Sequence, residues 1–312
     1  MKSRSLKRGV SGLLASLALL IALPSAVVPA AFAAEGLDAD DIEMKDGIPT
    51  YMNRWDCRST QHPVPVVMVH GTFSRQANQI DVTHLLNRKG FCVYGANLGY
   101  DPNNLVTQLE PDLYGTGDVE ETTKQLYEFV KTVQRRTGAK KVDIIGHSQG
   151  GLLIRNLITN YAPHAIRVAI MLGGTHNGST MSGLTTLAKP FLPDGVTAIT
   201  APITGPAVGQ QMVGSHFMNE LNKHPNTSPG VTYVVLVSPD DTQATPYKSG
   251  FLKPVKGSKV YNVDVKGYCH VPADHEIDHS DLHIDPIALS LIYWGVSYST
   301  YKNALPNCAM RL

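Results

Sequence analysis

The stretch Lys141–Arg155, with the sequence KVDIIGHSQGGLLIR, most constrains how this chain can fold. An apolar run, a serine between glycines and an apolar pattern of helical spacing predict a strand, a sharp turn and a helix. Ser148 then stands at the turn, clear of the sheet. A serine hydroxyl attacks only when a base takes its proton, and at this position a histidine can reach it. We therefore predict that Ser148 is a nucleophile.

The residues beside Ser148 fit this interpretation. Gly146 and Gly150 have no Cβ, so the strand and the helix can approach closely around a strained residue. The amide of Gln149, at the start of the helix, points to where the oxygen of an attacked carbonyl gains charge. We predict that Gln149 is one donor of an oxyanion hole.

A second donor is predicted after the apolar run 65–69, which fits a strand that is buried on both faces. Gly71 follows this run closely and lets the chain turn sharply. The turn brings the amide of Thr72 beside Ser148 as the second oxyanion donor. An ordinary turn at the end of a strand is the alternative interpretation.

Strands and helices alternate around these two segments. Helical spacing follows at 80–86 before Gly90, and Asp118 with Glu121 resembles a capping box that opens a helix ending near Gly138. Alternation of this kind predicts an α/β fold with a mostly parallel sheet covered by helices on both faces. The further strands are predicted at 91–94, 167–172, 231–237 and 258–265, and a final helix passes through Leu289 and Ile292.

The N-terminus has the pattern of a secretory signal peptide. Four basic residues precede an uncharged run from Gly9 to Ala34, which ends in Ala31-Phe32-Ala33. Cleavage after Ala33 leaves 279 residues (312 − 33) and predicts a secreted, extracellular protein. An uncleaved membrane anchor is the alternative, because the run is nearly long enough to span a bilayer.

The remaining length suits one domain. With 43% hydrophobic residues and a formal net charge of +1, the chain can fill a core, and no basic stripe suggests nucleic-acid binding. We predict an irregular lead-in at 34–56, a single catalytic domain at 57–312, and a monomer. Within that domain, residues 179–218 are nearly uncharged and lack a clear period, which favours an apolar cap over the site. Ordinary core helices are the alternative.

Acidic residues and histidines follow the last strands of the predicted sheet. Asp240 and Asp241 come just after the strand 231–237, at the edge where parallel sheets place their sites. The segment 274–286 contains His275, His279 and His283, and geometry alone leaves all three open as the base. A metal site there is disfavoured because the spacing of the ligands is irregular. His176, in the loop after the strand 167–172, is expected only to line the site.

The order serine, aspartate, histidine is that of α/β-hydrolases. From about Cys57 to Cys308 the chain resembles actinobacterial secreted lipases and esterases of the α/β-hydrolase superfamily, similar to class 2 triacylglycerol lipases. One departure affects local pocket shape, since Asn177-Gly178 stands where such proteins often have His-Gly. The matching motifs are His-Pro-x-Pro-Val-Val before His70-Gly71-Thr72, Gly115-x-Gly117, Gly146-His-Ser-Gln-Gly-Gly151, Thr245-Pro246-Tyr247 and Asp285-Pro286-Ile-Ala-Leu289.

The resemblance implies which acid and which histidine act with Ser148. His279 lies seven residues before Pro286, and Asp241 lies four residues before Thr245, where the similar lipases carry theirs. It therefore implies a catalytic triad of Ser148, Asp241 and His279. Asp240 and His275 are the alternatives.

Four cysteines follow the signal peptide, an even number that favours two disulfides in an exported chain. Cys57 and Cys92 flank neighbouring strand segments, whereas Cys269 and Cys308 bracket the histidine loop and the last helix. We expect these two pairs, and the resemblance implies the same pairs.

Together these patterns predict a secreted serine carboxylic-ester hydrolase, similar to triacylglycerol lipases, that cleaves lipid acyl esters and needs no cofactor and no metal. Its expected partner is a lipid or another acyl ester, and an apolar cap also allows transient contact with a lipid interface. The alternatives are a short-chain carboxylesterase or polyester hydrolase, and a non-catalytic fold that binds a lipid or a protein partner.

Overall fold

The computed structural model describes residues 42–183, 185, 195–297 and 304–312. The predicted signal peptide lies outside these residues, as does part of the predicted cap. Residues 43–312 form one compact unit. Within the described part of the chain, no helix combines the length and the apolar character that crossing a membrane requires.

Six strands form the central sheet, in the order β4-β3-β5-β6-β7-β8, and every neighbouring pair is parallel. The strands are short and rich in Val and Ile, and β3 and β5 are buried throughout, as expected of a sheet covered on both faces. The predicted parallel sheet is confirmed. Its strands are β3 (Val66–Val69), β4 (Val93–Gly95), β5 (Val142–His147), β6 (Ile166–Leu172), β7 (Thr232–Val237) and β8 (Lys259–Asp264).

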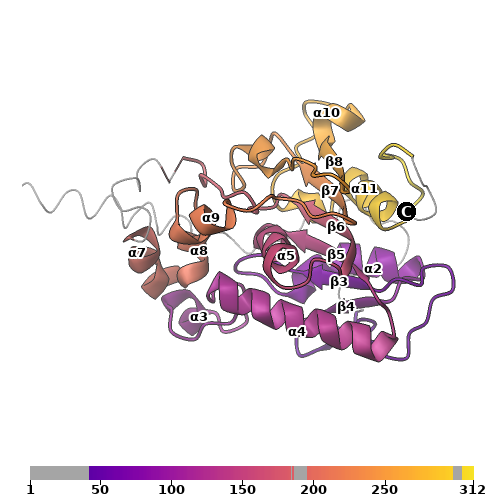
Figure 1. The fold of residues 1–312 in the computed structure, drawn as a ribbon, viewed down its shortest axis with the longest axis horizontal. Helices are drawn as coiled ribbons and strands as arrows, with labels where there is room; N and C mark the ends of the chain where they lie inside the picture. Colours follow the sequence, from indigo (N-terminus) through magenta and orange to yellow (C-terminus); the bar gives the residue numbers. More distant parts are fainter. Residues whose placement is uncertain (1–41, 184, 186–194, 298–303) are drawn as a thin grey trace, which may run out of the picture. The chain divides into compact units, whose positions relative to one another are not determined.

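Helices cover both faces of this sheet (Figure 1). On one face α4 (Val119–Thr137) and α5 (Gln149–Asn160) pack against alternate strand residues such as Val67 and Ile144. On the other, α2 (Ile80–Arg88) and α11 (Pro286–Val296) pack against the intervening residues, such as Met68 and Ile145. Successive strand side chains point to opposite faces, so each strand contributes to two hydrophobic layers.

The ends of α4 follow the chemistry of its sequence. The Asp118 side chain accepts a hydrogen bond from the Glu121 amide at 3.0 Å, and Gly138 ends the helix with φ 77°. Glycine tolerates this left-handed conformation because it has no Cβ. The predicted cap residues at both ends are confirmed.

The remaining helical elements are short. Most of them lie in the loops that follow β3, β4, β6, β7 and β8. They are η2 (Gln76–Gln79), α3 (Leu105–Leu109), α7 (Gly195–Thr204), α8 (Pro206–Gln210), α9 (His216–Leu221), η4 (Tyr247–Gly250), α10 (Val265–Cys269) and η5 (Asp281–His283).

A small hairpin precedes the sheet, in a segment that the sequence pattern predicts as irregular. β1 (Met44–Lys45) pairs antiparallel with β2 (Ile48–Pro49). Asp46 and Gly47 between them have φ values of 52° and 70°, which suits the tight turn of a two-residue hairpin. The prediction of an irregular segment was therefore wrong at 44–49, because so short a hairpin leaves no periodic pattern.

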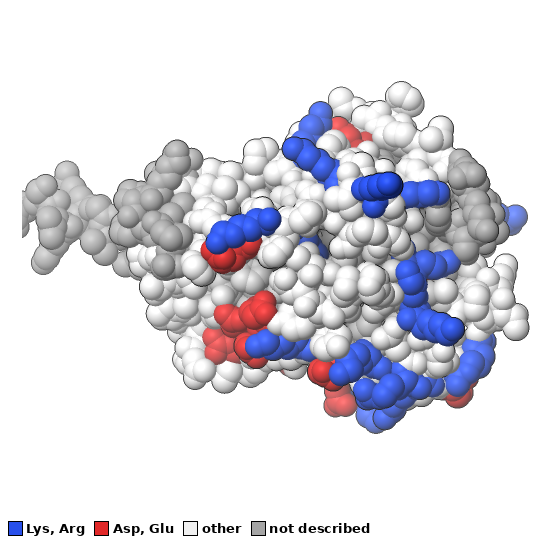
Figure 2. Space-filling model, viewed as in Figure 1, with Lys and Arg blue, Asp and Glu red and all other residues white. Residues whose placement is uncertain are grey.

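The predicted cap segment contains α7, α8 and the start of α9. Residues 195–215 include no Asp, Glu, Lys or Arg, and the surface over α7 and α8 is almost uncharged in Figure 2. Ile199 in α7 and Val213 after α8 remain exposed. The described residues of this segment are thus uncharged at 195–215, and its role as a cap over the site stays a prediction.

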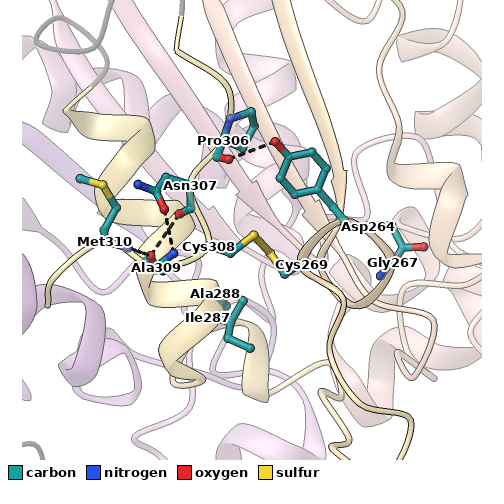
Figure 3. Close-up of a disulfide and its surroundings, with 12 residues drawn as sticks. Asp264, Gly267, Cys269, Ile287, Ala288, Pro306, Asn307, Cys308, Ala309 and Met310 are labelled. Carbon is teal, nitrogen blue, oxygen red and sulfur yellow. Dashed lines mark hydrogen bonds between the residues drawn. A yellow bond between two sulfur atoms is a disulfide. The ribbon is translucent and has the colours of Figure 1, made fainter.

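Both expected cysteine pairs are formed. Cys57 is bonded to Cys92, and Cys269 to Cys308. Figure 3 shows how the second disulfide joins the end of α10 to the C-terminal segment. Around it the Tyr268 hydroxyl donates to the Pro306 oxygen at 3.0 Å, which holds the same two segments together.

Candidate active site

Ser148 lies between β5 and α5 in a strained conformation, with φ 56° and ψ −121°. A residue with a side chain rarely adopts such a φ, and strain of this kind concentrates at functional positions. The Ser148 amide donates to the Leu172 oxygen of β6 at 2.9 Å, which holds the turn on the sheet. The predicted strand, sharp turn and helix are all present.

The glycines around this turn leave no room for a side chain. A Cβ on Gly146 would lie 2.5 Å from the backbone carbon of Gly150, and a Cβ on Gly150 would overlap the Val69 oxygen. A Cβ on Gly71 would lie 2.9 Å from the Ser148 Cβ. The loop after β3, the serine turn and α5 therefore meet backbone to backbone.

His70 fixes the start of the loop that carries Thr72. Its Nε2 accepts a hydrogen bond from the Leu98 amide at 2.9 Å, so its Nδ1 carries the hydrogen and donates to the Gly71 oxygen at 2.9 Å. Complete burial lowers the pKa of His70 to about 4, and the bond to Gly71 offsets only part of this effect. A neutral imidazole thus holds Gly71 in place.

Gly115 supports the same loop from the other side. Its φ is 71°, and a Cβ there would overlap the Gly71 oxygen and lie 3.0 Å from the Thr72 Cα. The Gln149 side chain donates to the Gly115 oxygen at 3.0 Å. Both predicted oxyanion residues, Thr72 and Gln149, therefore contact one glycine, in the Gly-x-Gly motif that the sequence contains.

Asp241 and His279 form a buried pair. Asp241 Oδ2 lies 2.8 Å from His279 Nδ1, while its Oδ1 accepts the amides of Gln243 and Ala244 at 2.8 Å each. The exposed fractions of the two residues are 5% and 3%. Three hydrogen-bond contacts therefore fix the orientation of this carboxylate beside the His279 ring.

Asp240, the alternative acid, points to other partners. Its Oδ2 accepts from Lys266 Nζ at 2.7 Å and from the Ile277 amide at 2.9 Å. Burial raises the pKa of Asp240, but the hydrogen bonds from Lys266 and Ile277 and the nearby charges together outweigh this effect, so the net shift of the pKa is downward. Asp240 fixes the loop before His279 and does not contact its ring.

The other two histidines of the segment are also bound elsewhere. His275 Nε2 lies 2.8 Å from Asp285 Oδ2, and its side chain is 42% exposed. His283 is half-buried and packs against His147, with 4.7 Å between the ring centroids. Its burial, together with the neighbouring His279, lowers the pKa of His283 to about 4, so the ring is neutral.

The structure thus brings Asp241 and His279 into contact, and it ties their loop to the serine turn through His147, whose Nε2 lies 2.8 Å from the His279 oxygen. Among the described residues, no hydrogen bond joins Ser148 Oγ to His279 Nε2. Such bonds often tighten only when substrate is bound.

His176 and Asn177, in the loop after β6, have structural contacts. His176 Nε2 lies 2.6 Å from the Gly250 oxygen, and complete burial lowers its pKa to about 4. Asn177 Nδ2 donates to the Ser249 oxygen at 2.7 Å. Both residues hold η4 against the loop, and among the described residues no hydrogen bond of their side chains reaches Ser148 or His279.

Sequence patterns alone missed two buried residues near the site. Arg155, inside α5, donates from Nη1 and Nη2 to five oxygens, including those of His176 and Leu221. Gln211, after α8, binds Thr72. A charged residue inside the apolar helix was a visible signal for Arg155, whereas nothing local marks Gln211.

Two cavities adjoin α5. One, of about 700 Å³, is lined by residues of α4, α5, α7, α8 and α9, among them Asn156, Phe217 and Leu221. The other, of about 370 Å³, lies beside Arg155. Ser148, Asp241 and His279 line neither of these two cavities.

Comparisons with known proteins add a family and a fold. The family model described as palmitoyl protein thioesterase matches residues 65–226, slightly more than half of the chain. A triacylglycerol lipase of Vibrio cholerae is 32% identical over 130 residues, or 40% of this chain and 36% of the relative. One of Pseudarthrobacter phenanthrenivorans is 36% identical over 122 residues, 37% of this chain and 34% of that protein. The chain thus aligns with about a third of their length.

Among solved structures, Aspergillus fumigatus lipase B superposes with a TM-score of 0.62 at 17% identity. The superposition covers 84% of this chain and 57% of that structure. At this identity the likeness concerns the fold.

Proposed function

Because the chain belongs to the palmitoyl protein thioesterase family and has the α/β-hydrolase fold, we propose that it is a serine ester hydrolase that cleaves acyl esters of lipids. The matched relatives named triacylglycerol lipases support this substrate class. One observation carries the proposal: Ser148 stands in a strained turn whose preceding residue, His147, binds the loop of the buried Asp241–His279 pair.

In the proposed first step, His279 Nε2 takes the proton of Ser148 Oγ while Oγ bonds to the ester carbonyl carbon. Asp241 orients the ring through Nδ1 and stabilises the imidazolium. The amides of Thr72 and Gln149 stabilise the negative oxygen of the tetrahedral intermediate.

The intermediate then collapses. The bond from carbon to the alcohol oxygen breaks, His279 gives its proton to the leaving alcohol, and the acyl group stays on Ser148. Water, deprotonated by His279, attacks this acyl-enzyme and releases the carboxylic acid as the proton returns to Ser148. None of these steps needs a metal or a cofactor.

The rest of the assignment is also proposed. A signal peptide at 1–33 directs secretion, a lead-in at 34–56 precedes the catalytic domain at 57–312, and a monomer acts on lipid esters with transient contact at their interface. The two disulfides support an oxidising compartment. The cap at 179–218 covers the acyl chain, which the absence of charged residues at 195–215 supports.

A long-chain thioester is a second candidate substrate, since the matching family is described by that activity. Thioesters and oxygen esters present the same carbonyl to a serine. Hydrolysis of short-chain esters and polyesters would need the same catalytic groups, so the preferred acyl chain length distinguishes these candidates.

The test is hydrolysis by the purified chain without residues 1–33. We expect it to cleave chromogenic esters with a preference for long acyl chains, and Ser148→Ala to lose at least about a thousandfold in rate. Activity undiminished in Ser148→Ala would exclude the proposed nucleophile. A steep preference for acetate esters would instead favour a short-chain esterase, and failure of a serine-directed probe to label Ser148 would favour a non-catalytic binding protein.

A further inference from the structure

Gln211 connects the cap segment to the loop of Thr72. It follows α8, and its exposed fraction is 2%. Its Nε2 donates to Thr72 Oγ1 at 2.9 Å and to the Ala207 oxygen at 3.1 Å, while its Oε1 accepts from Thr175 Oγ1 at 2.8 Å. Every hydrogen-bonding atom of this amide side chain is therefore used.

Thr175 carries the connection on to the serine turn. It follows β6, is 4% exposed, and donates its amide to the Ser148 oxygen at 3.2 Å. A continuous chain of polar groups thus runs from the half-buried Thr72 through the buried Gln211 and Thr175 to the backbone of Ser148. Such a chain holds its members in one arrangement, because breaking it leaves buried polar atoms without partners.

Only an amide side chain fits the middle of this chain. The position must donate to one hydroxyl and to a backbone oxygen while it accepts from another hydroxyl. A glutamate cannot donate when ionised, and a methionine of similar length does neither. Position 211 therefore requires the donor and the acceptor of an amide as well as a side chain of this length.

We propose that Gln211 is a positioning residue through which the cap fixes Thr72 for catalysis. This inference rests on the proposed function, in which the Thr72 amide stabilises the oxyanion. Oxyanion donors act only within a narrow range of distances to the developing charge, so a small displacement of Thr72 weakens the transition state more than the bound substrate. The cap is thus part of the catalytic framework as well as a cover.

Gln210 provides a matched control in the same segment. Its Nε2 donates to Asp118 Oδ2 at 2.6 Å, and its Oε1 accepts the Val119 amide at 2.9 Å. It therefore ties the cap to the first turn of α4 and is not hydrogen-bonded to Thr72 or Thr175. The same substitution at Gln210 and at Gln211 therefore makes the same chemical change at two positions that have different hydrogen-bond partners.

The experiment measures kcat, KM and the inhibition constant of an alkyl boronic acid, which forms a tetrahedral anionic adduct on serine, for Gln211→Met, Gln211→Glu and Gln210→Met. In Gln211→Met we expect kcat to fall by roughly tenfold to a hundredfold, with KM within about threefold and boronate affinity falling in parallel. Gln211→Glu falls further, because its charge opposes the oxyanion. Gln210→Met keeps its kcat within about twofold.

Thr72→Val tests the same link from the other end. It removes the hydroxyl that Gln211 binds, so it reproduces the loss of Gln211→Met, and the double variant loses little more than either single variant. An unchanged kcat in folded Gln211→Met, or an equal loss in Gln210→Met, overturns the inference. If Gln211→Met does not fold, an unchanged kcat in Thr72→Val overturns the inference instead. An inactive wild-type chain instead refutes the proposed function itself.

Discussion

His147 Nε2 lies 2.8 Å from the backbone oxygen of His279, so the residue directly before Ser148 holds the loop that carries the proposed base. Burial, with smaller contributions from His279 and His283, keeps the pKa of His147 well below its ordinary value. The neutral ring therefore retains the hydrogen that it donates to His279. This single bond fixes two proposed catalytic residues relative to each other although they are 131 positions apart.

The identity of the base is the first prediction. His279→Ala should lose at least about a thousandfold in kcat/KM, because Ser148 then has no group to take its proton. His275→Ala is the control, since its ring binds Asp285 and is partly exposed. It should stay within about tenfold in the same ester assay. A dead His275→Ala beside an active His279→Ala would reverse the assignment.

The adjacent acids give the second prediction. Asp241→Asn keeps the shape of the side chain but removes the charge that stabilises the imidazolium, so kcat should fall by roughly a hundredfold to ten-thousandfold. Asp240→Asn weakens the contact with Lys266 and should mainly lower the melting temperature. Rates and melting curves of both variants check this, and an equal loss of kcat in Asp240→Asn would contradict it.

Local patterns predicted the sheet, the serine turn and the caps of α4 because each depends on residues close in sequence. The choice between Asp240 and Asp241 did not follow from spacing, since adjacent side chains after a strand point in different directions and only the folded chain places His279. Gln211 was invisible for a similar reason: its partner Thr72 is 139 positions away. The histidines at 275, 279 and 283 are spaced four apart, but the segment was predicted as a loop, and its spacing alone did not select His279.

Acid should destabilise the fold, which is the third prediction. His70, His176 and His283 each have a pKa of about 4 in the folded chain, chiefly because they are buried. Their unfolded pKa is 6.5, so the unfolded chain binds protons first as the pH falls. Their contribution to stability is complete above pH 6.5 and is lost as the pH falls toward 4.

Protonating one such histidine in the folded state costs roughly 3 kcal/mol. Asp143 has the opposite effect on stability, because burial raises its pKa to about 6 and Arg167 offsets only part of this shift. The contribution of this one carboxyl is smaller than that of the three histidines together. The melting temperature should fall by roughly 10 °C from pH 7 to pH 5. His176→Gln can still donate to Gly250 without titrating, so its fall should be shallower. Equal slopes in both proteins would contradict the prediction.

The last prediction concerns the disulfide between Cys269 and Cys308. The cysteines are 39 positions apart, and in the chain-entropy model the bond stabilises the fold by about 4 kcal/mol. Cys57 and Cys92 are 35 positions apart, so that bond should stabilise it by a similar amount. Replacing either pair by serine should therefore lower the melting temperature equally. Only the loop closed by Cys269 and Cys308 contains His279, and the segment around His279 has little regular structure.

We therefore expect only the variant that lacks the Cys269–Cys308 disulfide to lose ester hydrolysis several degrees below its melting transition, because this loop opens before the sheet unfolds. Activity that follows the melting curve in both variants would show that the bond stabilises the fold without holding His279.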